Sequence, residues 1–185
     1  MSETTNKKKF LSTKDMVMCA LCAALIVVCS WISIPAAVPF TLQTFGVCVA
    51  TGLLGTKRGS ISVIVYIILG LVGLPVFSGF KGGPAALFGM TGGYIIGFIF
   101  TALIVGLITS KFGKSIPVLA LSMVLGIAIC YVFGTAWFMI VYASKVEAIS
   151  LAKALSMCVI PFIIPDIIKI VLATVIVKRL SKVVD

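Results

Sequence analysis

Six apolar stretches, separated by short basic turns or by Gly- and Pro-rich connections, restrict this chain to a membrane fold. A helix needs about 20 apolar residues to cross the hydrocarbon core of a bilayer. The 185 residues therefore leave room for about six such helices. The second and third stretches are short, so they require local thinning of the bilayer or packing against neighbours. The stretches cover about residues 16–34, 40–54, 60–74, 92–110, 116–141 and 159–177.

The composition excludes an ordinary soluble domain. Hydrophobic residues make up 61% of the chain and charged residues 11%, and the mean hydropathy is +1.28. Soluble domains have roughly half apolar and a quarter charged residues. The net charge of +10 would favour nucleic acid as the partner of a soluble protein. Because the basic residues lie at the ends of apolar stretches, we instead expect a lipid bilayer around the chain and no nucleic-acid partner.

The distribution of Lys and Arg predicts the orientation. With six crossings, both termini share one side with the turns at 55–59 and 111–115. The other side carries only Lys81, Lys145 and Lys153. By the positive-inside rule, we expect both termini in the cytoplasm. Residues 1–14 then form a cytoplasmic tail, and residues 15–182 form one all-α, six-helix transmembrane domain. The 11 basic residues of the cytoplasmic side are Lys7, Lys8, Lys9, Lys14, Lys57, Arg58, Lys111, Lys114, Lys178, Arg179 and Lys182.

The outer side carries the long connections 35–40, 75–91 and 142–158, and the first two are rich in Pro or Gly. Irregular backbone is tolerated at membrane depth only where protein or a water-filled cavity satisfies its polar groups. We therefore expect an outward-facing ligand pocket capped by these three connections. Within the third, the amphipathic residues 142–156 predict a short helix at the membrane interface.

Asp166 and Lys169 are the sharpest indication of a site. They lie three residues apart in an apolar stretch, so they share one face of a helix. Charged residues at this depth are costly and usually face a ligand or the interior of a bundle. The pair therefore favours a polar ligand site. Two alternatives are a self-neutralising pair that ties helices together and a Lys169 side chain that extends to the membrane interface.

Four further residues are candidates for binding a ligand. Lys81 is the only cation of the Gly-rich connection and suits a carboxylate, although it is equally an ordinary solvated lysine. Thr41 and Gln43 can hydrogen-bond a ligand, or they can cap a helix and bond to a neighbouring helix. Tyr94 offers a ring with a hydroxyl group, as Trp137 offers one with an N–H, but an interfacial aromatic belt explains both.

Other features of the sequence limit the chemistry. The chain has no His, no phosphate-binding loop for ATP and no paired carboxylates, so we expect neither an enzyme, nor a metal site, nor a cofactor. Cys19 and Cys22 form a lone C-x-x-C pattern, which we interpret as apolar packing. Ala20 and Ala24 lie four apart, a spacing that lets another helix approach, although internal packing also explains it.

Four segments of the chain stand out: VPFTLQTF (38–45), GLPVF (73–77), GGPAALFGMTGGYIIGF (82–98) and PFIIPDIIK (161–169). Together they resemble the BioY family, the biotin-specific S components of energy-coupling factor (ECF) transporters. The resemblance extends over nearly all of residues 14–180. The family often has Pro where Met90 stands in this chain, so the resemblance leaves the bend of that connection open.

The resemblance implies a function and partners. It implies a six-helix subunit of a bacterial cell membrane that binds biotin in an outward-facing pocket. It also implies assembly with a membrane T subunit, which contacts Ala20 and Ala24, and with two ATPase subunits. Asp166 and Lys169 match the family's biotin-contacting acid and base. The alternatives are an S component for another small vitamin, a membrane enzyme, and a structural membrane protein without a ligand.

Overall fold

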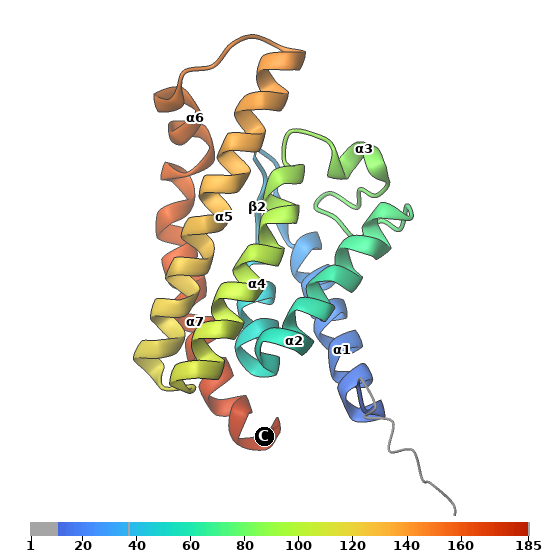
Figure 1. Ribbon diagram of the computed structural model, residues 1–185. Helices are drawn as coiled ribbons and strands as arrows, with labels where there is room; N and C mark the ends of the chain where they lie inside the picture. Colours follow the sequence, from blue (N-terminus) through green and yellow to red (C-terminus); the bar gives the residue numbers. More distant parts are fainter. Residues whose placement is uncertain (1–10, 37, 185) are drawn as a thin grey trace, which may run out of the picture.

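The computed structural model of the chain describes residues 11–36 and 38–184. It is helical apart from two short antiparallel strands (Figure 1). Its elements are α1 (Thr13–Trp31), β1 (Ser33–Ile34), β2 (Phe40–Thr41), α2 (Gln43–Leu71), α3 (Pro84–Leu87), α4 (Gly92–Phe112), α5 (Ile116–Lys145), α6 (Leu151–Cys158) and α7 (Ile160–Val184).

Five segments of the described part of the chain are long and apolar enough to cross a membrane. They are α1, α2, α4, α5 and the segment Leu151–Lys182, which joins α6 to α7. The outward side chains of these helices are apolar, and Val132, Ile140 and Ile164 each expose more than two thirds of their surface. An apolar surface of this kind fits lipid, so the prediction of an all-helical membrane protein agrees with the structure.

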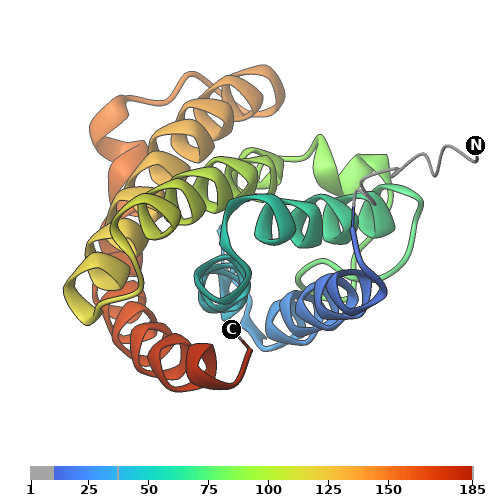
Figure 2. The same cartoon turned by 60° about the horizontal axis from the view of Figure 1, so that its bottom comes forward.

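Helix α2 covers most of two of the six predicted apolar stretches, 40–54 and 60–74. The sequence predicted a turn between them, and the structure has a sharp break there, with non-helical backbone at Gly55 (φ 71°, ψ −170°) between two helical halves. Glycine adopts a positive φ without the steric cost that other residues meet there. The two halves of α2 consequently run in different directions (Figure 2). The six predicted stretches therefore correspond to five helical segments, of which α2 consists of two halves.

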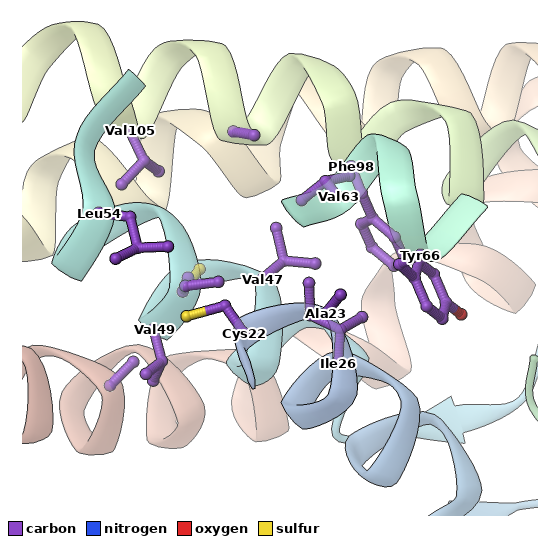
Figure 3. Close-up of a cluster of buried hydrophobic side chains, with 14 of the residues drawn as sticks. Cys22, Ala23, Ile26, Val47, Val49, Leu54, Val63, Tyr66, Phe98 and Val105 are labelled. Atoms are coloured by element: carbon purple, nitrogen blue, oxygen red, sulfur yellow. The ribbon is translucent and has the colours of Figure 1, made fainter. Parts of the chain in front are cut away.

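The helices pack closely where small residues face large ones. Helix α4 lies between α2 and α5, with Gly93 against Trp137 and Gly134 against Tyr94. A Cβ atom at either glycine would lie 2.3 Å from the facing aromatic side chain, so only glycine allows this approach. Figure 3 shows the core between α1, α2 and α4, where Ile26, Val47 and Val105 are fully buried.

The two ends of the bundle differ. The start of α1 and the end of α7 lie at the same end, together with the bend of α2 and the α4–α5 turn (Figure 1). The β-strands, α3 and the α5–α6 connection lie at the opposite end. The predicted interfacial helix at 142–156 is shorter than expected, because α5 continues to Lys145 and α6 begins at Leu151. Residues 1–10 of the predicted tail lie outside the described residues.

Candidate functional site

A cavity of about 550 Å³ opens among β2, the start of α2, residues 77–91 and helices α4, α5 and α7. It lies at the end of the bundle that carries the long connections, as the sequence predicted. Its walls include all six residues predicted to bind a ligand: Thr41, Gln43, Lys81, Tyr94, Asp166 and Lys169.

Asp166 and Lys169 form a buried ion pair in the wall of this cavity. Lys169 Nζ lies 2.7 Å from Asp166 Oδ1, and the two residues expose only 8% and 3% of their surface. They lie within the first turns of α7, directly after Pro165. The charges offset one another, which lowers the cost of holding both away from water. Lys169 points to Asp166 and the cavity, which argues against the alternative that it extends to the membrane interface.

Two hydroxyl groups that the sequence patterns did not indicate form hydrogen bonds with this ion pair. Thr44 Oγ1 donates to Asp166 Oδ1 at 3.0 Å and accepts from Lys169 Nζ at 3.3 Å. Tyr131 OH donates to Asp166 Oδ2 at 2.5 Å. Both residues line the cavity. A tyrosine in the middle of an apolar span needs a partner for its hydroxyl, and this requirement was a signal in the sequence for Tyr131.

Gln43 takes part in a chain of hydrogen bonds along one wall. Thr41 Oγ1 donates to Gln43 Oε1 at 3.0 Å, and Gln43 Nε2 donates to the hydroxyl of the fully buried Tyr66. Tyr66 lies beyond the bend of α2, so the Gln43 amide joins the two halves of this helix. Gln43 therefore makes a hydrogen bond between helical segments, which was the alternative to ligand binding, although the residue also lines the cavity.

Tyr94 and Trp137 differ in their relation to the cavity. The Tyr94 hydroxyl lies 2.9 Å from Thr135 Oγ1, and the Tyr94 ring lines the cavity. Trp137 Nε1 donates to the carbonyl oxygen of Gly89 at 3.0 Å, and Trp137 is not a lining residue. Trp137 therefore anchors the connection before α4, whereas Tyr94 contributes to the wall.

Lys81 lies at the exposed edge of the cavity, within the connection 72–91. This connection is anchored to α1, since Trp31 Nε1 donates to the carbonyl oxygen of Pro75 at 2.8 Å and the Trp31 ring stacks on Phe80. Phe77 N donates to Lys81 O at 2.9 Å and closes the connection into a tight loop. A cationic group thus borders the mouth while the charged pair lies deeper.

The remaining walls are mostly apolar. Phe77 and Phe98 are almost fully buried beside the cavity. Phe162, near the start of α7, stacks on Phe40 with 4.2 Å between ring centroids. Apolar walls with a few convergent polar groups are the usual design of a site for a small organic molecule.

Ala20 and Ala24 lie away from this cavity. Both are exposed on α1, where they line a separate shallow, apolar groove of about 300 Å³ with Val65 and Leu69 of α2. Cys19 and Cys22 are buried free thiols. Within residues 11–36 and 38–184, no three His, Cys, Asp or Glu side chains come together in a way that would hold a metal ion.

The sequence and the fold have counterparts in known proteins. The model of the BioY family matches residues 3–185. The chain belongs to the BioY family. It is 41% identical to a biotin transporter BioY of Thermotoga maritima, covering 91% of this chain and 96% of that protein. It is 37% identical to a biotin transporter BioY of Rhizobium etli, covering 88% and 90% of the two chains.

A solved structure has the same fold. The crystal structure of the S component for biotin from an ECF-type ABC transporter superposes with a TM-score of 0.82 and 32% identity. The match covers 98% of this BioY chain and 95% of the other. The resemblance drawn from the four sequence segments is thus confirmed. The matched proteins are named as transporters or as a transporter component, which agrees with the prediction that the chain is not an enzyme.

Proposed function

We propose that this BioY chain is the biotin-binding S component of an ECF-type importer in a bacterial cell membrane. The observation that carries the proposal is the buried pair of Asp166 and Lys169, which lines a 550 Å³ cavity with mostly apolar walls. Sites for small organic ligands have volumes of about 300–1,000 Å³. In this proposal the two halves of α2 count as separate crossings, both termini are cytoplasmic and the cavity faces outward.

The chemistry of the cavity suits biotin. The fused rings of biotin are compact and apolar except at the ureido edge, which has an oxygen between two N–H groups. Lys169 donates to the ureido oxygen, and Asp166 and its hydroxyl partners accept from the N–H side. The rings pack against Phe77 and Phe162, and the carboxylate extends to Lys81 at the mouth.

The proposal includes the partner subunits. The sequence has no ATP-binding loop, so the energy for uptake comes from two ATPase subunits through a membrane T subunit. The exposed Ala20 and Ala24 form the small-residue face against which a helix of the T subunit packs. We expect the isolated chain in proteoliposomes to bind biotin without accumulating it. Concentrative uptake by the chain alone would contradict the dependence on partners.

Calorimetric titration of the purified chain in detergent with biotin tests the site. We expect tight binding by the wild type and a loss of about thirtyfold or more in Asp166→Asn and in Lys169→Met, because each change leaves a buried charge unpaired. The matched controls are Glu147→Gln and Lys153→Met. They alter an exposed ion pair with a 3.5 Å separation, away from the cavity, and should leave biotin affinity unchanged.

The three possible failures have different meanings. If the folded wild type does not bind biotin, the proposed ligand is wrong, and other small vitamins are the next candidates. If biotin binds but both charged-pair variants keep full affinity, Asp166 and Lys169 only tie α7 into the bundle. If the exposed controls lose as much affinity as the buried variants, the effect reflects net charge and not the cavity.

A further inference from the structure

The hydrogen-bond donors around Asp166 differ in how many N–H or O–H groups they have left for a ligand. Lys169 has three N–H donors, of which one points to Asp166 and one to Thr44. Thr44 and Tyr131 have one O–H each, and both give it to the Asp166 carboxylate. Neither hydroxyl has a proton left for a ligand. Toward the cavity, these two oxygens therefore act only as acceptors.

The cavity wall thus presents a fixed pattern to a ligand. Beside Asp166, the third N–H of Lys169 remains as a donor, next to the acceptor oxygens of Thr44, Tyr131 and Asp166. A group that accepts at one atom and donates from adjacent N–H groups matches this pattern. A neutral cyclic urea is such a group. A guanidinium of the same shape donates where the urea accepts, so it meets the N–H of Lys169 with a donor and a positive charge.

We propose that Tyr131 is a specificity-determining residue of this site. By giving its proton to Asp166 Oδ2, Tyr131 occupies one acceptor position of the carboxylate and presents its own oxygen to the ligand as a further acceptor. The site then selects a neutral urea over a cationic analogue. The inference rests on the proposed function, and it concerns a residue that acts on the ligand both directly and through Asp166.

Phenylalanine at this position tests the inference because it keeps the ring and removes the hydroxyl. In Tyr131→Phe, Asp166 Oδ2 loses its donor and becomes available to a cation in the cavity. We expect the Kd for biotin to rise about tenfold or more. The Kd for 2-iminobiotin, whose guanidinium is protonated at neutral pH, should rise much less or fall. The ratio of the two Kd values therefore shrinks by about tenfold.

The control is Tyr142→Phe, which makes the same change on the same helix at a residue that does not line the cavity. Equal rises in both Kd values for Tyr131→Phe would overturn the inference, since a structural role weakens every ligand alike. Unchanged Kd values would also overturn it. Failure of the wild type to bind biotin at all would instead refute the proposed function.

A second variant covers the case in which Tyr131→Phe does not fold. Thr44→Val keeps the shape of the side chain and removes the other hydroxyl from Asp166 and Lys169. Because Asp166 again loses a hydroxyl donor, we expect Thr44→Val to show a weaker preference for biotin over 2-iminobiotin. A folded Thr44→Val protein with the wild-type ratio would contradict the hydrogen-bond pattern assigned to this wall.

Discussion

At one end of the bundle the chain reverses within a few residues, whereas at the other end long connections surround a cavity (Figure 1). At the end with tight turns, basic side chains bind the backbone. Lys114 Nζ donates to Leu53 O at 3.1 Å, Lys178 Nζ donates to Lys114 O at 3.1 Å, and Arg58 pairs with Asp15 at 2.9 Å. The two lysine contacts satisfy backbone carbonyl groups near the turns, and the Arg58–Asp15 ion pair ties α1 to α2.

At the cavity end, the exposed cation of the wall, Lys81, does not bind the backbone as the basic residues at the other end do. Among the described residues, the Lys81 ammonium has no hydrogen-bond or ion-pair partner, and the charged pair of α7 lies deep in the wall. The two ends of the bundle therefore have separate roles. The end with tight turns holds the helices together, and the cavity end keeps polar groups available to a ligand. Changes at the first end should affect stability, and changes at the second should affect binding.

The largest effect is expected for Gly106→Ala at the end with tight turns. A Cβ atom at residue 106 would lie 2.4 Å from Thr56 Cα and 2.7 Å from Thr56 N, so α4 must move away from the bend of α2. We expect a loss of about 3 kcal/mol of stability, seen as a lower thermal midpoint in detergent. Biotin affinity of the folded fraction should stay within about twofold.

A control for Gly106→Ala is Gly113→Ala, because residue 113 has a positive φ of 82° and open space around it. This variant strains the backbone without pushing a helix aside, so it should lose about 1–3 kcal/mol while biotin affinity stays unchanged. A Gly106→Ala protein with normal stability but weak biotin binding would break the proposed separation of roles.

The next largest effect is expected for Gly82→Ala at the cavity end. A Cβ atom at residue 82 would lie 2.2 Å from the carbonyl oxygen of Leu74, so the connection 72–91 must shift. We expect biotin affinity to fall about tenfold, while the thermal midpoint without ligand changes little. Calorimetry and thermal unfolding of the same sample measure both. Lost stability with intact affinity would reverse the assignment of roles.

The smallest effect is expected for Lys81→Met. The exposed ammonium should contribute about threefold in affinity, as a solvated charge pair does. The loss should occur for biotin and be absent for biotin methyl ester, which has no carboxylate. Lys145→Met is the control, because Lys145 is an exposed lysine near the same end that does not line the cavity. Equal losses for biotin and the ester would sharpen the comparison by placing the carboxylate elsewhere.

The sequence predicted the helices and the charged pair well because both depend on local signals. Long apolar stretches must become helices in a bilayer, and charges inside them need a partner. The break at Gly55 agrees with the turn predicted from the basic residues after it, although the sequence did not indicate that helical structure resumes directly beyond Gly55.

The rest of the site was not predictable from local patterns. Thr44 and Asp166 are 122 residues apart, and Tyr131 and Asp166 are 35 apart, so only the packing of three helices brings them together. The same limit applied to Gln43, whose amide was expected to face either a ligand or another helix. Its bond to Tyr66 depends on the path of α2 after the bend, which apolar periodicity does not specify.

A structure of the chain determined with bound biotin tests the central claim most directly. The account predicts biotin inside the cavity of about 550 Å³, with its ureido oxygen within hydrogen-bond distance of Lys169 Nζ and its carboxylate toward Lys81. Biotin bound outside this cavity, or inside it without contact to Asp166, Lys169 and Tyr131, would contradict the account.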